Sequence, residues 1–147
     1  MDFRDALNIV TAELTPQPWD YTDKAGVTLT VIPACLREAP GYAEVNIRIT
    51  ADKTTAAEVG VTTTYMTSLL HALEARTGWE HSTSYGSDLN VTADSDGVAL
   101  VVSETDYETQ GHPTATVTIR VPEAQRLPLA SALRRAADVA RGWEDPR

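Results

Sequence analysis

Two pairs of similar segments recur in the same order along the chain, and this repeat limits the possible folds more than any other feature. Residues 26–31 (GVTLTV) resemble residues 97–102 (GVALVV), and residues 43–49 (AEVNIRI) resemble residues 115–121 (ATVTIRV). The second segment follows the first after 17 residues in one half and 18 in the other. Because self-similarity at a fixed spacing is typical of repeated structural units, we interpret the pattern as an internal duplication.

The tripeptide Gly-Trp-Glu extends the repeat, since it occurs at residues 78–80 and again at residues 142–144. Each copy follows a segment that we expect to be helical, so each half has the order ββα. We place the two units at residues 26–80 and 88–144 and expect Trp79 and Trp143 to fill equivalent core positions. The alternative is that strands rich in Val, Ile and Thr resemble each other by chance.

Alternation of apolar and polar residues predicts the strands, because neighbouring side chains of a strand point to opposite faces of its sheet. We expect strands at residues 27–32, 43–49, 88–93, 97–103 and 114–121, and a further short strand near residues 79–84. The Asp94–Gly97 segment predicts a hairpin turn in which glycine supplies a positive φ. A calcium loop is the weaker interpretation, because the glycine stands at position 4 and not at position 6.

Apolar residues at a spacing of three and four predict three helices, at residues 2–14, 62–76 and from Pro128 to Gly142. We expect Thr77 and Gly78 to end the second helix, because glycine is the usual residue at that position. Pro128 suits the first turn of the third helix, where its missing N–H is not needed.

These elements predict an α+β fold with one or two antiparallel sheets of about 5–6 strands and three helices, in a single domain over residues 1–147. The order of elements, the size and the acidity resemble those of the small acidic chaperones of type III secretion.

The composition excludes several classes of protein. A hydrophobic content of 42% is sufficient for a packed core, and no apolar run reaches the roughly 18–20 residues of a membrane span. The first residues have neither the basic nor the apolar segment of a secretory signal, and Cys35 is the only cysteine, so we expect a cytoplasmic protein. Ten of the twelve basic residues are arginine, which favours a high-GC, bacterial genome.

The net charge of -9 is unevenly distributed. Residues 77–119 contain no Lys or Arg but carry seven acidic residues, whereas six arginines follow between residues 120 and 147. Such acidity disfavours binding to nucleic acid or to anionic membranes. We therefore expect a basic protein partner at the densest part of this stretch, formed by Glu104, Asp106, Tyr107 and Glu108. Solvation of an acidic sheet face is the alternative.

Two aromatic residues, Trp19 and Tyr21, lie in an expected loop between prolines and acidic residues. We include them in the predicted partner surface, while packing of the loop onto the domain is the alternative explanation. The arginines of the last helix include Arg134 and Arg141 two turns apart, and we expect pairing with Asp138 to absorb part of their charge.

No catalytic, cofactor or metal motif is present. Cys35 has no local signature of a nucleophile, and the pair His71 and Glu74 has the spacing of helical metal ligands but lacks a second such pair. His81 and His112 lie in other elements. We therefore predict no catalytic residues, no cofactor and no bound metal.

The leading hypothesis is a non-enzymatic, acidic protein-binding module of the inhibitor, immunity or secretion-chaperone type, acting as a homodimer without nucleic acid or membrane. A phage or particle assembly protein is the alternative. A small enzyme with dispersed residues is the third hypothesis, and it requires a pocket that gathers a histidine with a carboxylate.

Overall fold

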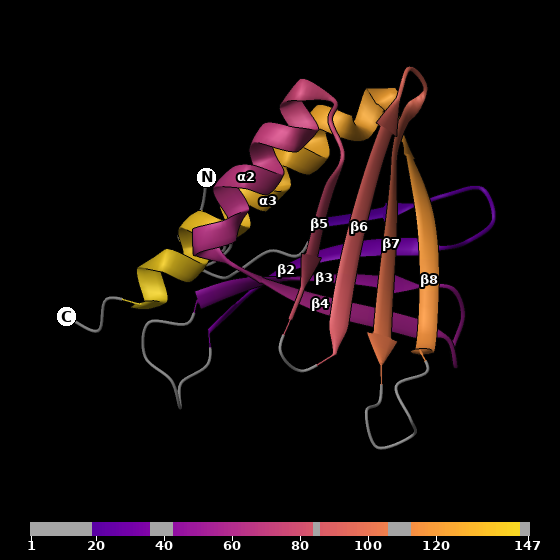
Figure 1. The fold of residues 1–147 in the computed structure, drawn as a ribbon, viewed down its shortest axis with the longest axis horizontal. Helices are drawn as coiled ribbons and strands as arrows, with labels where there is room; N and C mark the ends of the chain where they lie inside the picture. The colour runs from indigo at the N-terminus through magenta and orange to yellow at the C-terminus, as the bar shows by residue number, and fades with distance from the viewer. Residues whose placement is uncertain (1–18, 36–42, 84–85, 106–112, 145–147) are drawn as a thin grey trace, which may run out of the picture.

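The computed structural model describes residues 19–35, 43–83, 86–105 and 113–144, and within them the chain forms two four-stranded antiparallel sheets, each followed by a helix (Figure 1). The first half contains β1 (Trp19–Thr22), β2 (Thr28–Cys35), β3 (Ala43–Thr50), β4 (Ala56–Thr62) and α2 (Thr63–Ala75). The second half contains β5 (Trp79–Ser82), β6 (Ser87–Asp94), β7 (Gly97–Thr105), β8 (Pro113–Pro122) and α3 (Glu123–Glu144).

Within each sheet the strands follow one another in chain order, so every connection inside a sheet is a hairpin. The strands of the first sheet run across those of the second, and α2 and α3 lie next to each other on one side of the sheets (Figure 1). Strand β4 contacts β6, β7 and β8, while α3 packs on β2 and β3 of one sheet and on β7 and β8 of the other. One hydrophobic core therefore joins both sheets and both helices.

Strand β3 shows how the alternating pattern builds this core. Ala43, Val45, Ile47 and Ile49 are all buried, while the residues between them face outward. Burial of each large aliphatic side chain contributes about 1.5–3 kcal/mol, so this periodicity fixes which face of the sheet points inward. Neither described helix is long and apolar enough to cross a membrane.

The α+β class with antiparallel sheets is confirmed, but the expected 5–6 strands and three helices are corrected. The described residues form eight strands and two helices, and the helix expected at residues 2–14 lies outside them. Two strands were missed. Strand β1 lies where a loop was expected, and β4 (AAEVGVT) is a weakly patterned segment that pairs along its whole length with β3.

The expected ββα repeat is also corrected, because the repeated unit of the structure is ββββα. Gly26 and Gly86, 60 residues apart, occupy matching turns with φ of 88° and 95°. Thus β2 corresponds to β6 and β3 to β7, whereas the sequence match paired β2 with β7 and β3 with β8. Trp79 opens β5 as Trp19 opens β1, so Trp79 and Trp143 are not equivalent. The single domain over residues 1–147 stays a prediction.

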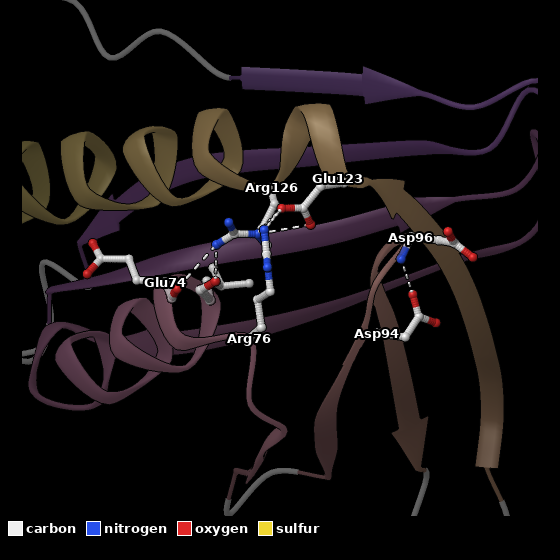
Figure 2. Close-up of polar contacts among 7 residues, drawn as sticks. Glu74, Arg76, Asp94, Asp96, Glu123 and Arg126 are labelled. Carbon is white, nitrogen blue, oxygen red and sulfur yellow. Dashed lines mark hydrogen bonds and ion pairs between the residues drawn. The ribbon is translucent and has the colours of Figure 1, made fainter.

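The predicted hairpin at residues 94–97 is confirmed, with Asp94 paired to Gly97. The Asp94 carboxylate accepts the backbone N–H of Asp96 at 2.8 Å, a contact drawn in Figure 2. Gly97 has φ of 146°, and a Cβ there would lie 2.1 Å from the backbone oxygen of Val121. Glycine is therefore required both by the backbone conformation and by the close approach of β8.

The residue that caps α2 and the start of α3 differ from the sequence expectation. Helix α2 ends at Ala75, and the cap residue Arg76 adopts the left-handed conformation (φ 56°, ψ 47°) expected of a glycine and donates its N–H to the Ala72 carbonyl. Helix α3 begins at Glu123, so Pro128 lies inside the helix and not at its start. Pro128 is the sixth residue of α3 and lies beyond the first four N–H groups, so it removes one backbone hydrogen bond from the helix.

Candidate functional site

An aromatic cluster lies where the edge strand β5 meets the first turns of α2. The ring centroids of Tyr65 and His81 are 4.9 Å apart with the planes tilted by 45°, and those of Trp79 and His81 are 5.6 Å apart and nearly parallel. We call Tyr65, His81 and Trp79 the aromatic cluster. Tyr65 is 52% exposed, whereas the other two rings are half-buried. The cluster therefore offers one exposed ring backed by two more.

Local structure places the three rings together. Trp79 and His81 alternate with the exposed Glu80 and Ser82, so both rings lie on the inner face of β5. The Trp79 indole Nε1 donates a 2.9 Å hydrogen bond to the Ser68 hydroxyl, which donates to the backbone carbonyl of Tyr65 at 2.9 Å. This chain of bonds ties the edge strand to the helix that carries Tyr65.

Burial lowers the pKa of His81, while the charge of Asp88 on the neighbouring strand acts in the opposite direction. The imidazole is therefore neutral at neutral pH, and it can stack between the other two rings without a charge. The first turn of α2, which carries Tyr65, contains no acidic residue. Tyr65 therefore lies near the positive end of the α2 dipole, in a turn without acidic side chains.

A groove of about 380 Å³ runs between the two helices. Its lining comes from α2 through Thr67, Leu70, His71 and Glu74 and from α3 through Arg134, Asp138 and Arg141. An ion pair of 2.5 Å between Arg134 and Glu74 crosses the groove. Arg141 pairs with Asp138 at 3.2 Å and also donates to the backbone carbonyl of Thr63 at 3.4 Å.

The buried side chain of Arg126 joins the end of α2 to the start of α3. Figure 2 shows its polar contacts. Its guanidinium donates to the Leu73 carbonyl at 2.6 Å and to the Glu123 carboxylate at 3.1 Å. Arg76 pairs with the same carboxylate, and the two arginines, Arg76 first, hold the pKa of Glu123 below its usual value. Arg126 satisfies carbonyls at the end of α2 that have no partner within the helix.

The charge is divided between two layers of the fold. Helices α2 and α3 together with Arg76 carry five arginines against four acidic residues, whereas the described strands and turns carry four basic against ten acidic residues. Charge therefore disfavours a polyanion over the sheets but not beside the helices.

The structure separates the residues predicted to bind a partner. Glu104 lies near the end of β7, and its carboxylate accepts the backbone N–H of Glu58 at 3.3 Å, so it contacts the edge of the other sheet. Asp106, Tyr107 and Glu108 lie outside the described residues. Trp19 and Tyr21 belong to β1 and pack, half-buried, against the core. Glu104 therefore lies on the second sheet and the two aromatic residues on the first, and the role of these residues in binding a partner stays a prediction.

Sequence reasoning missed Tyr65, which lies among Thr and Met residues at an expected helix start. The available signal was the alternation of Trp79 and His81 on a short strand, which places two rings on one face. His71 and Glu74 do line one groove, but His81 stacks in the aromatic cluster. Within the described ranges no three His, Cys, Asp or Glu side chains are placed to hold a metal ion.

No protein-family model and no curated protein sequence matches the chain. Solved structures do match its fold. WHY3 from Arabidopsis thaliana superposes with a TM-score of 0.66 at 15% identity, covering 86% of this chain and 89% of that one. The plant transcriptional regulator PBF-2 superposes with a TM-score of 0.64 at 16% identity, covering 88% and 84%. At this identity the likeness establishes the fold alone.

These neighbours correct the functional hypothesis. The expectation of an acidic protein-binding module without nucleic acid is contradicted, because one of the proteins that share this fold is a regulator of transcription. Net charge misled the prediction because it averages over the molecule, while binding depends on the local surface. Both proteins come from plants, so they give the expected bacterial origin no support.

Proposed function

We propose that this chain binds single-stranded nucleic acid and that an unpaired base stacks on Tyr65 of the aromatic cluster. The likeness of the fold to a transcriptional regulator supports nucleic acid as the ligand class. The aromatic cluster favours single-stranded over double-stranded nucleic acid as the ligand, because unpaired bases expose the ring faces that a duplex hides.

The arrangement suits stacking more than the reading of base edges. Tyr65 is half exposed, and the His81 ring beside it, itself stacked on Trp79, limits its motion. Stacking of a base on an aromatic side chain contributes about 1–3 kcal/mol and tolerates any base, because every base has a π-face. We expect binding with little sequence preference and without catalysis.

The acidity of the chain limits the electrostatic part of binding. With a net charge of -9, few phosphates can be neutralised, so affinity depends on stacking more than on counterion release. This predicts a shallow dependence of affinity on salt, unlike that of a basic binding protein.

The test is fluorescence anisotropy with labelled single-stranded DNA, single-stranded RNA and duplex DNA of equal length. We expect both single strands to bind more tightly than the duplex, and Tyr65→Ala to weaken binding by about 5- to 150-fold, the equivalent of one lost stacking interaction. Tyr65→Phe keeps the ring and should bind like the wild type.

Leu127→Ala is the matched control, because Leu127 is the other large hydrophobic residue exposed among those described, at 53% against 52% for Tyr65. It should leave binding unchanged. A preference for duplex DNA, or equal binding by Tyr65→Ala and the wild type, would overturn the proposal.

A further inference from the structure

We infer that the groove between α2 and α3 holds the phosphate backbone of the same single strand, through Arg134 and Arg141. This inference rests on the proposed function, because it extends the path of the strand away from the aromatic cluster. The groove brings cationic side chains of α3 together with polar side chains of α2, and the inference gives this groove a role.

The two arginines are accessible and already oriented. Their side chains are 53% and 46% exposed, and each is held by one carboxylate, Glu74 for Arg134 and Asp138 for Arg141. Exposed ion pairs of this kind contribute little to stability, so a guanidinium can exchange its carboxylate for a phosphate oxygen at small cost. A guanidinium also has five N–H donors, and one carboxylate leaves several of them available.

The groove and the aromatic cluster lie on neighbouring sides of one helix. Thr67 lines the groove, and the next residue, Ser68, bonds Trp79 of the cluster. Arg141 reaches the carbonyl of Thr63, which is two residues and about 3 Å along the helix axis from Tyr65. A nucleic-acid strand stacked on Tyr65 therefore crosses only the exposed hydroxyl side chains of α2, those of Thr64, Thr67 and Ser68, before it reaches the arginines.

The distribution of charge favours this path over the others. The sheets carry the acidic excess, so the helix layer is the part of the described surface where a polyanion meets no net repulsion. Two further exposed arginines have close ion pairs: Arg76 with Glu123, and Arg120 of β8 with both oxygens of Asp94. A single nitrogen of Arg120, Nη2, donates to both oxygens, and the charge of Asp96 also acts on this arginine, so its acidic surroundings disfavour a phosphate.

If phosphates compete with carboxylates for these arginines, then removal of the carboxylates must strengthen binding. We expect Glu74→Gln and Asp138→Asn each to raise the affinity for single-stranded DNA. A merely structural role of the two ion pairs predicts the opposite, since their loss would loosen the packing of α2 on α3. The direction of this change therefore separates the two explanations.

The experiment measures anisotropy of labelled oligo-dT with the full chain over a range of KCl concentrations. Arg134→Gln and Arg141→Gln should each lower affinity at least about threefold at low salt and reduce the slope of log K against log salt by about 0.7. Arg135→Gln is the matched control, because Arg135 is exposed on the same helix, one residue from Arg134, and does not line the groove.

Arg141→Gln also removes the contact with the Thr63 carbonyl, and this loss could affect folding. Arg141→Lys is therefore measured beside it, because lysine keeps the positive charge. If the Arg134 and Arg141 variants bind like Arg135→Gln with an unchanged salt slope, while Tyr65→Ala is still weakened, the groove assignment is wrong and the proposed function stands. Weaker binding by Glu74→Gln or Asp138→Asn would overturn the assignment as well. Absence of any binding by the wild type would overturn both.

Discussion

The indole Nε1 of Trp79 lies 2.9 Å from the hydroxyl oxygen of Ser68, so a single hydrogen bond joins the edge strand β5 to helix α2. Both residues belong to surface elements, yet the bond orients the ring of Trp79, which stacks on His81, and His81 in turn contacts Tyr65. A small change in a hydroxyl group can thus alter the aromatic cluster without touching its rings.

We predict that Ser68→Ala weakens the binding of single-stranded DNA by about fivefold, because a hydrogen bond of this kind contributes about 1 kcal/mol and its loss frees the Trp79 ring. Anisotropy titration measures the effect. Ser131→Ala, which removes an exposed hydroxyl from α3, should bind like the wild type. Equal affinities for the two variants would show that the bond does not orient the cluster.

Arg126 should be the most important polar residue for stability. We predict that Arg126→Met lowers the free energy of unfolding by about 3 kcal/mol, because it leaves the Leu73 carbonyl without its donor and removes one partner of Glu123. Urea denaturation measures the change. The exposed Arg135 provides the comparison, since Arg135→Met should stay within about 0.5 kcal/mol of the wild type.

Two glycines should respond differently to the same substitution. Gly97→Ala should destabilise the fold by about 3 kcal/mol or more, because the new Cβ meets the backbone of β8 and the φ of 146° disfavours any side chain. At Gly60 the three atoms nearest to the new Cβ all belong to the carboxylate end of the Glu44 side chain, which can rotate away. Gly60→Ala should therefore cost about 1 kcal/mol or less, as measured by thermal or urea unfolding.

Glu44 should make stability depend on pH. Burial, with a smaller effect from the charge of Glu58, raises the pKa of the Glu44 carboxyl in the folded chain above its ordinary value of 4.5. Because the folded state then binds the proton more tightly than the unfolded state, the contribution is favourable below pH 4.5 and is lost as pH rises through the raised pKa.

Glu44→Gln removes the buried charge and should raise the free energy of unfolding at pH 7, while the difference from the wild type should shrink as pH falls toward 4. Urea denaturation at several pH values measures both. Glu80→Gln, a change at an exposed position of β5, is the control at each pH. A destabilised Glu44→Gln at pH 7 would contradict the prediction.

The sequence predicted those elements whose pattern is local and strong. The alternation of residues 43–49 identified β3 and its inward face, and the helix expected at residues 62–76 is α2 within one residue at each end. The Asp94–Gly97 hairpin was predicted because a short turn with glycine leaves few alternatives. In each case neighbouring residues contain enough information to specify the structure.

The misses have one cause, which is dependence on partners far away in the chain. Strand β4 has a weak pattern of its own and is a strand because β3 and the second sheet cover it. Arg76 occupies the position after α2 where glycine is usual. The backbone N–H groups of Arg76 and Thr77 both donate to the Ala72 carbonyl and close the turn. The sequence repeat matched each strand of the first half with the strand after its true counterpart in the second half. Strands of Val, Ile and Thr resemble one another whatever their place in a sheet.

By itself the sequence determined the α+β class, the antiparallel hairpins and the face that each strong strand buries, because side-chain periodicity acts over a few residues. Only the tertiary structure decided that four strands and a helix form each half, that Tyr65 joins Trp79 and His81, and that Arg134 and Arg141 lie beside α2. These relationships join residues up to 78 positions apart. Net charge carries no information about such distances, so the acidity of the whole chain does not decide which charges gather on one surface.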